Sequence, residues 1–138
     1  MTATDFELNA RLAADTSPVA SLPLCDVLLM NDARYPWLVL VPRRSGLVEV
    51  ADLDTAEQTV LWQELSQVSA ALRSVIPCEK LNIGLLGNIV RQLHVHVVLR
   101  QLNDDAWPGP VWGHGTAVPY AQQPLQTLIQ SLQQLLSA

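Results

Sequence analysis

The most informative stretch of the sequence reads Gln92-Leu93-His94-Val95-His96-Val97-Val98-Leu99-Arg100, and polar and apolar side chains alternate along most of it. Successive side chains of a β-strand point to opposite faces, so this alternation predicts a strand over Leu93–Leu99. One face would carry Gln92, His94, His96, Val98 and Arg100, and the other would be wholly apolar. The apolar face predicts packing against a helix. The histidine face is expensive to bury without partners, so it predicts a site that is open to a ligand.

The two imidazoles of this face, those of His94 and His96, would lie about 7 Å apart at their Cα atoms. Exposed histidines without a function are one interpretation, and a zinc site completed by His114 is another. A cupin-like zinc site is excluded, because Arg100 and Gln101 stand where a glutamate would be needed. We favour nucleophilic catalysis on phosphorus. A neutral imidazole attacks phosphorus well when its other nitrogen donates to a fixed acceptor, and a strand offers backbone carbonyls for this.

The composition indicates one compact domain, which we expect to span residues 1–138. Of the 138 residues, 49% are apolar, which excludes a disordered chain. The formal net charge of -5 makes duplex DNA or RNA a poor partner, whereas a single nucleotide needs only a few local donors. No signal peptide and no apolar run of about 20 residues are visible, so we expect a cytoplasmic protein without membrane contact.

Helical spacing is clearest behind Asp54-Thr55-Ala56-Glu57, a capping box. Apolar residues recur there at intervals of three and four, which predicts a long helix over residues 55–76. Shorter helices are predicted near both ends, over residues 5–14 behind the capping box Thr4–Glu7 and over residues 121–136.

Four further strands are predicted besides the histidine strand: Val19–Leu24, Cys25–Met30, Trp37–Val41 and Lys80–Leu86. Trp37–Val41 is wholly apolar, so we expect it to be buried on both faces. One long helix between two groups of strands predicts an α+β fold, in which an antiparallel sheet of about five strands is covered on one face. Asn103–Pro119 is expected to be a long loop.

The motif His-φ-His-φ-His-φ-φ, in which φ is apolar, marks the histidine-triad (HIT) family, and Gln92–Val98 resembles it everywhere except at the first position. Gly87–Val90 precedes the motif much as a Gly-Gln-Ser/Thr-Val stretch does in the family. Trp37–Pro42 looks like a family strand that ends in proline, and residues 106–112 resemble Trp-Pro segments of some members. In particular, the chain looks like bacterial HIT-like proteins described as diadenosine tetraphosphate hydrolases.

The resemblance implies a HIT-like homodimer whose two sheets join into one. It also implies hydrolysis or transfer at the α-phosphate of a nucleotide, through a nucleotidyl-histidine intermediate and without a cofactor or metal. The middle motif position, His94, would be the nucleophile, and the last, His96, would contact the phosphate. Asn82 and Asn88 would donate to the phosphate or position it. Asn31 or Asp32 would lie near the ribose.

Three positions depart from the family pattern. Gln92 replaces the first histidine, and Trp37 stands where many members have a histidine that pairs with it. Ile89 occupies the place of a phosphate-binding Ser or Thr. A nucleotide-binding module with little or no catalysis is therefore the alternative function.

The sequence allows more than one role for an arginine and for two tryptophans in or after the motif. Arg100 is either a phosphate clamp or a surface charge. Trp107 and Trp112 are interpreted as loop anchors or dimer contacts rather than as base-stacking groups.

Overall fold

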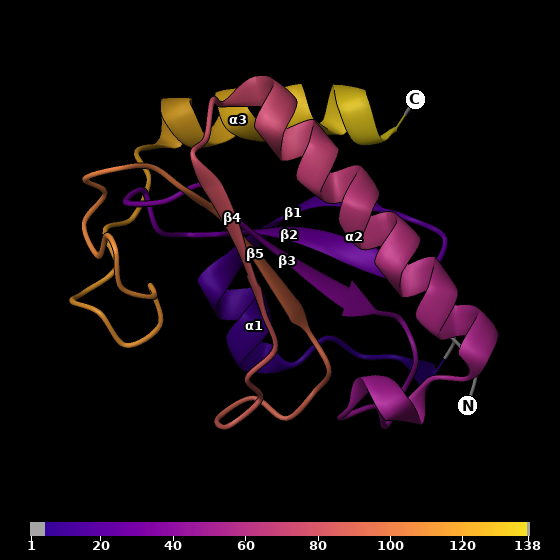
Figure 1. The fold of residues 1–138 in the computed structure, drawn as a ribbon. Coiled ribbons are helices and arrows are strands. Elements are labelled where there is room, and N and C mark those ends of the chain that lie inside the picture. Colours follow the sequence, from indigo (N-terminus) through magenta and orange to yellow (C-terminus); the bar gives the residue numbers. More distant parts are fainter. Residues whose placement is uncertain (1–4, 138) are drawn as a thin grey trace.

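A five-stranded antiparallel sheet forms the centre of the computed structural model, which describes residues 5–137 (Figure 1). The strands follow the spatial order β1-β2-β3-β5-β4. They are β1 (Thr16–Ser21), β2 (Cys25–Met30), β3 (Trp37–Pro42), β4 (Lys80–Gly84) and β5 (Val95–Arg100). The helices are α1 (Ala10–Asp15), α2 (Thr55–Val75) and α3 (Gln122–Leu136), and a short 3-10 helix, η2, spans Val50–Asp52. The predicted α+β class is confirmed.

The strand β3 is buried along its whole length, as is its neighbour β5. It lies between β2 and β5, and all six of its residues are buried, as its wholly apolar sequence predicted. It pairs antiparallel with β5, so that Val39 faces His96 and Trp37 faces Val98. Diagonal neighbours on one face of a sheet lie within reach of long side chains, and this register brings Trp37 next to His96.

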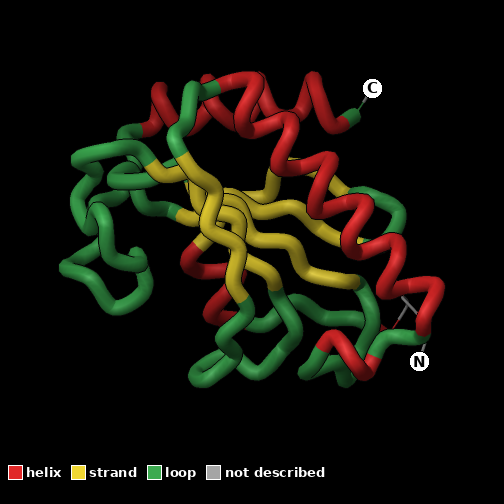
Figure 2. Tube along the Cα trace, viewed as in Figure 1, coloured by secondary structure: helices red, strands yellow, loops and turns green. Residues whose placement is uncertain are grey.

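Apolar layers cover both faces of the sheet, whereas we had expected only one covered face. On one face, α2 packs against the apolar side of β5 and α3 packs against α2 and β1, with Val95 and Val97 in the same cluster as Leu65 and Leu132. On the other face, α1 and the segment after β5 form a second cluster (Figure 2). That cluster includes Leu12, Tyr35, Trp37, Val98 and Val111. The predicted long loop therefore folds back onto the sheet and buries apolar side chains of its own.

The first helix is shorter than predicted and begins at Ala10 rather than at Asp5. Asn9 caps it, because its side chain accepts hydrogen bonds from the backbone N–H groups of Arg11 and Leu12. The predicted capping box includes Thr4, which lies outside the described residues.

The first strand begins at Thr16, three residues earlier than predicted, and contains Pro18. A proline is tolerated there because β1 is an edge strand and its register shifts between Pro18 and Ala20.

The histidine strand also begins later than predicted. β5 starts at Val95 and β4 ends at Gly84, so Gln92 and His94 precede the strand instead of belonging to it. From Val95 onward the predicted alternation holds, since Val97 and Leu99 face α2 and Val98 faces the opposite cluster. None of the helices within residues 5–137 is long and apolar enough to cross a membrane.

Candidate active site

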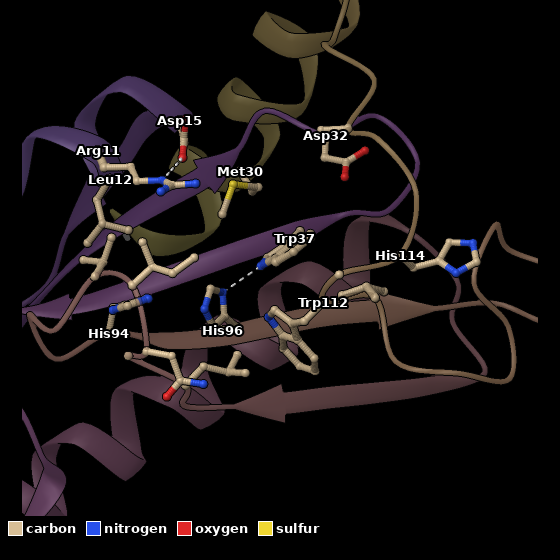
Figure 3. Close-up of a pocket in the computed structure, with 18 of the residues that line it drawn as sticks. Arg11, Leu12, Asp15, Met30, Asp32, Trp37, His94, His96, Trp112 and His114 are labelled. Carbon is tan, nitrogen blue, oxygen red and sulfur yellow. Dashed lines mark hydrogen bonds and ion pairs between the residues drawn. The ribbon is translucent and has the colours of Figure 1, made fainter.

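A cavity of about 410 Å³ opens on the face of the sheet that carries α1 (Figure 3). Its walls come from α1, the loop 86–90, the start of β5 and the segment 111–117. The volume lies within the range of pockets that hold small ligands. His94 and His96 both line it, and their ring centroids are 4.9 Å apart.

The imidazole of His94 is held by the backbone just before β5. Its Nδ1 lies 2.6 Å from the carbonyl oxygen of Gln92. A carbonyl oxygen only accepts hydrogen bonds, so Nδ1 carries the proton. When the ring is neutral, Nε2 therefore has a free lone pair, and it is the nitrogen left available to a ligand in the cavity.

The imidazole of His96 has the opposite arrangement. Its Nδ1 lies 3.0 Å from Nε1 of Trp37, and an indole N–H can only donate. Burial, with a smaller contribution from the nearby His94, lowers the pKa of His96 to about 4. The ring is therefore neutral near pH 7, with its proton on Nε2. Together the two histidines offer a ligand one lone pair and one N–H.

Trp37 lines the cavity, and its contact with His96 was not apparent from the sequence. From the sequence it appeared only as a departure from a histidine pair, but in the structure it fixes the tautomer of His96. The pairing of β3 with β5 is the signal that could have found it, because that register places Trp37 diagonally across from His96.

Gln92 is not next to the other two motif residues on the strand face, which corrects the expected placement. Its Oε1 accepts a hydrogen bond from the backbone N–H of Asn9 at 2.8 Å. Its Nε2 donates to the carbonyl oxygen of Glu7, also at 2.8 Å. Both ends of the amide are thus committed to the segment that leads into α1, and Gln92 lies outside the residues that line the cavity. Through Asn9, Gln92 supports the helix that forms one wall.

Replacing Gln92 with methionine should loosen the entry to α1. The variant keeps the side-chain length but leaves the Asn9 N–H and the Glu7 carbonyl without partners, so we expect a loss of about 1–2 kcal/mol in the free energy of unfolding. Hydrogen exchange should become faster over residues 7–12. Gln101→Met is the matched control, because Gln101 donates to the carbonyl of Pro77 instead. Unchanged exchange over residues 7–12 in Gln92→Met would contradict the contact.

Asn88 is the predicted phosphate-binding asparagine that lines the cavity. The other one, Asn82, is directed elsewhere: its Oδ1 accepts from Nη1 of Arg100 at 2.8 Å. Asn31 is also committed, since its Oδ1 accepts from the backbone N–H of Tyr120 at 2.9 Å. The structure therefore places Asn82 and Asn31 outside the cavity, which corrects both expectations.

Asp32 lines the cavity but has little capacity left for a ligand. Its carboxylate accepts from Nε and Nη2 of Arg34 and from the backbone N–H groups of Arg34 and Val118. Burial alone would raise the pKa of Asp32, but these hydrogen bonds outweigh it and hold the pKa below its usual value. The carboxylate is thus already bonded within the protein, and the expected place of Asp32 near the ribose stays a prediction.

Arg100 is neither a phosphate clamp nor a surface charge. Its side chain is 1% exposed and forms a two-pronged ion pair with Asp104, with distances of 2.7 Å and 2.8 Å. The guanidinium also lies over the rings of Tyr35 and Trp107. Arg100 is thus a buried structural charge, and both interpretations from the sequence are wrong.

His114, the proposed third zinc ligand, lies on the far side of the cavity from His94 (Figure 3). Its Nε2 is 3.4 Å from a carboxylate oxygen of Asp105. Within residues 5–137 no three side chains of His, Cys, Asp or Glu are grouped so that they could hold a metal ion.

The stability of the fold should depend on His96 between about pH 4 and pH 6.5. An unfolded histidine titrates near 6.5, whereas the pKa of His96 in the fold is about 4, so the unfolded chain binds more protons in this window. The free energy of unfolding should therefore fall as the pH is lowered from 6.5 towards 4, by up to about 3 kcal/mol. Urea unfolding of the wild type and of His96→Asn over this range measures the effect. An equal slope in both proteins would disprove the assignment to His96.

A family model and three solved structures agree on the proteins that this chain resembles. The HIT domain family model matches residues 11–103. A histidine triad protein from Sinorhizobium meliloti 1021 is 46% identical, with a TM-score of 0.94, and the match covers 98% of this chain and 100% of that one. One from Bradyrhizobium japonicum is 46% identical, with a TM-score of 0.93 and coverages of 95% and 98%. A third, from Marinobacter aquaeolei VT8, is 45% identical, with a TM-score of 0.92 and coverages of 96% and 96%. No curated protein matches the chain.

Proposed function

Because the chain belongs to the HIT domain family, whose members are in general nucleotide hydrolases or transferases, we propose that it cleaves a nucleotide at the α-phosphate through a covalent intermediate on His94. The observation that carries this proposal is the complementary protonation of two adjacent imidazoles. The Gln92 carbonyl leaves Nε2 of His94 with a lone pair, and the Trp37 N–H leaves Nε2 of His96 with a proton.

The reaction runs in two displacements at the same phosphorus. Nε2 of His94 attacks the α-phosphorus, a P–N bond forms, and the bond to the leaving group breaks, with its electron pair staying on the leaving group. Water then attacks the phosphorus, the P–N bond breaks, and its electron pair returns to Nε2 while the proton of the water passes to solvent. If another acceptor replaces water, the same intermediate makes the protein a nucleotidyl transferase.

His96 and Asn88 are the residues proposed to hold the phosphoryl group. His96 and Asn88 both line the cavity, and the Nε2–H of His96 and the side-chain amide of Asn88 are the groups that would donate to the non-bridging oxygens. Preorganised donors of this kind stabilise charge as it develops on those oxygens. Leu12, Met30 and Val90 form an apolar part of the wall that suits a nucleobase.

The substrates proposed are nucleoside phosphoanhydrides, dinucleoside polyphosphates such as diadenosine tetraphosphate among them, and nucleoside phosphoramidates. The test is a panel of both classes with the wild-type protein, with chromatography to detect the nucleoside monophosphate. A quench at alkaline pH, where a phosphorus–nitrogen bond to histidine survives, followed by peptide mapping should locate the nucleotidyl group on His94. If no member of the panel is cleaved, the proposed hydrolase activity is wrong.

A nucleotide-binding module with little catalysis is the second candidate. The observation that favours it is Ile89, an apolar side chain on the cavity wall at the position of the family's phosphate-binding hydroxyl. Tight binding of AMP in calorimetry, together with no cleavage of any panel member, would support this candidate over the first.

The homodimer implied by the resemblance stays a prediction. The place for it would be β4, which forms one edge of the sheet and has one strand neighbour, β5, within residues 5–137. Ile83 of β4 and the following Leu85 and Leu86 are large apolar residues with exposed side chains. A second copy joined along this edge would cover them.

A further inference from the structure

The side chain of Trp112 forms part of the wall of the cavity. Its ring centroid lies 5.6 Å from that of His96 and 6.2 Å from that of Trp37, in edge-to-face arrangements. The ring rests on Gly84, which pairs with His96 across the two strands. A Cβ atom at Gly84 would come within 2.9 Å of the ring, so the absence of a side chain there makes room for the indole. Trp112 is therefore held against the same histidine that is proposed to bind the phosphoryl group.

The indole N–H of Trp112 is buried and has no acceptor within the described part of the chain. A buried donor without a partner costs folding free energy, so one next to a ligand site needs an explanation. Trp37, which lies beside it, shows the contrast, because its own N–H is satisfied by His96. Two other buried side-chain groups also have no partner, the hydroxyls of Tyr35 and Ser69, but neither residue lines the cavity.

We propose that Trp112 is a catalytic residue whose indole N–H donates to a non-bridging oxygen of the phosphoryl group bound at His94 and His96. This inference rests on the proposed function. The indole N–H of Trp112 would supply the donor that Ile89 cannot provide, since an isoleucine stands where the family has a hydroxyl. The N–H is covered in the free protein, so the contact requires a small rotation of the indole when the ligand binds; catalytic hydrogen bonds commonly tighten only in the bound complex.

The chemistry of the step makes such a donor useful. As His94 attacks, negative charge builds on the non-bridging oxygens, and a neutral N–H in a site that excludes water stabilises that charge without changing its own protonation. His96 is neutral as well, because its pKa is about 4. Next to His94, the phosphoryl group would thus meet neutral donors, although Arg11 and Arg34 line other parts of the cavity.

The variant Trp112→Phe tests the proposal, because it removes the N–H and keeps an aromatic ring over Gly84. We expect kcat to fall about 100-fold with little change in KM, as when one oxyanion donor is lost. The melting temperature should fall only modestly, because removing an unpaired buried donor offsets part of the packing lost with the smaller ring. Trp62→Phe is the matched control, since Trp62 is an exposed residue of α2, and its turnover should equal that of the wild type.

The possible outcomes separate this proposal from a structural role and from the proposed function itself. Unchanged turnover of Trp112→Phe would overturn the proposal, as would a loss in which KM rises as much as kcat falls. If the wild type cleaves no substrate, the proposed function fails, and binding of AMP decides the inference instead. The chain has four tryptophans, so the indole N–H signal of Trp112 can be identified in a nitrogen-15 NMR spectrum by its loss in Trp112→Phe. A marked shift of this signal with AMP supports the contact, and no shift at saturation overturns it.

Discussion

Replacing His94 with alanine is expected to lower kcat for nucleotide cleavage by at least about 1,000-fold, because the attacking nitrogen is lost and no covalent intermediate can form. No other side chain of the described cavity wall presents an uncharged nitrogen lone pair fixed by a backbone carbonyl. Steady-state kinetics on the best substrate of the panel measures the loss. AMP affinity should change far less, since Asn88, His96 and the apolar wall remain.

The variant His94→Gly sharpens this test, because it leaves space for a free imidazole. Added imidazole should restore part of the turnover by attacking phosphorus in place of the missing side chain, and it should have no effect on the wild type. His114→Ala is the control, because His114 lies on the rim of the cavity and pairs with Asp105. Wild-type turnover in His94→Ala would show that His94 is not the nucleophile.

The regular parts of the fold were predictable because periodicity reports burial directly. β2 has the predicted bounds, and α2 differs from its prediction by one residue at its end. The alternation in β5 correctly separated the face that meets α2 from the face that meets α1. The bounds of β1 were missed because Pro18 marked a break, although an edge strand tolerates a proline.

The partners of the polar side chains could not be predicted, because they depend on segments far away in the sequence. Gln92 bonds to Glu7 and Asn9, more than 80 positions earlier, so its place in the motif suggested a catalytic role that its contacts do not support. Trp37 reaches His96 across 59 positions. In both cases the type of residue suggested hydrogen bonding, but only the fold identified the partners.

The buried structural role of Arg100 could not be predicted for a different reason. Its partner, Asp104, is only four positions away, but i,i+4 pairs of this kind are common on surfaces and contribute little there. What distinguishes this pair is that Tyr35 and Trp107 cover the guanidinium, and this burial depends on how the segment after β5 folds back onto the sheet.

Replacing Arg100 with methionine is therefore expected to cost about 3–5 kcal/mol of the free energy of unfolding, the largest stability effect we predict. The variant would leave the Asp104 carboxylate buried, with an 8% exposed side chain and without its counter-charge. Asp104 would keep the backbone N–H groups of Gln101 and Trp107, but these do not replace a two-pronged ion pair. Chemical unfolding at pH 7 measures the loss.

The chain contains an exposed control pair at the same i,i+4 spacing. Arg11 and Asp15 make a single, longer contact of 3.7 Å, and their side chains are 61% and 53% exposed. Arg11→Met should therefore change the free energy of unfolding by less than about 0.5 kcal/mol. The double variant Arg100→Met, Asp104→Leu should recover much of the loss, because no unpaired charge stays buried. Equal losses in the Arg11 and Arg100 variants would mean that burial does not determine the energy of these pairs.

Asp104 also accepts from the backbone of Trp107, so loss of the pair should loosen the segment that leads to Trp112 and lower turnover as well as stability.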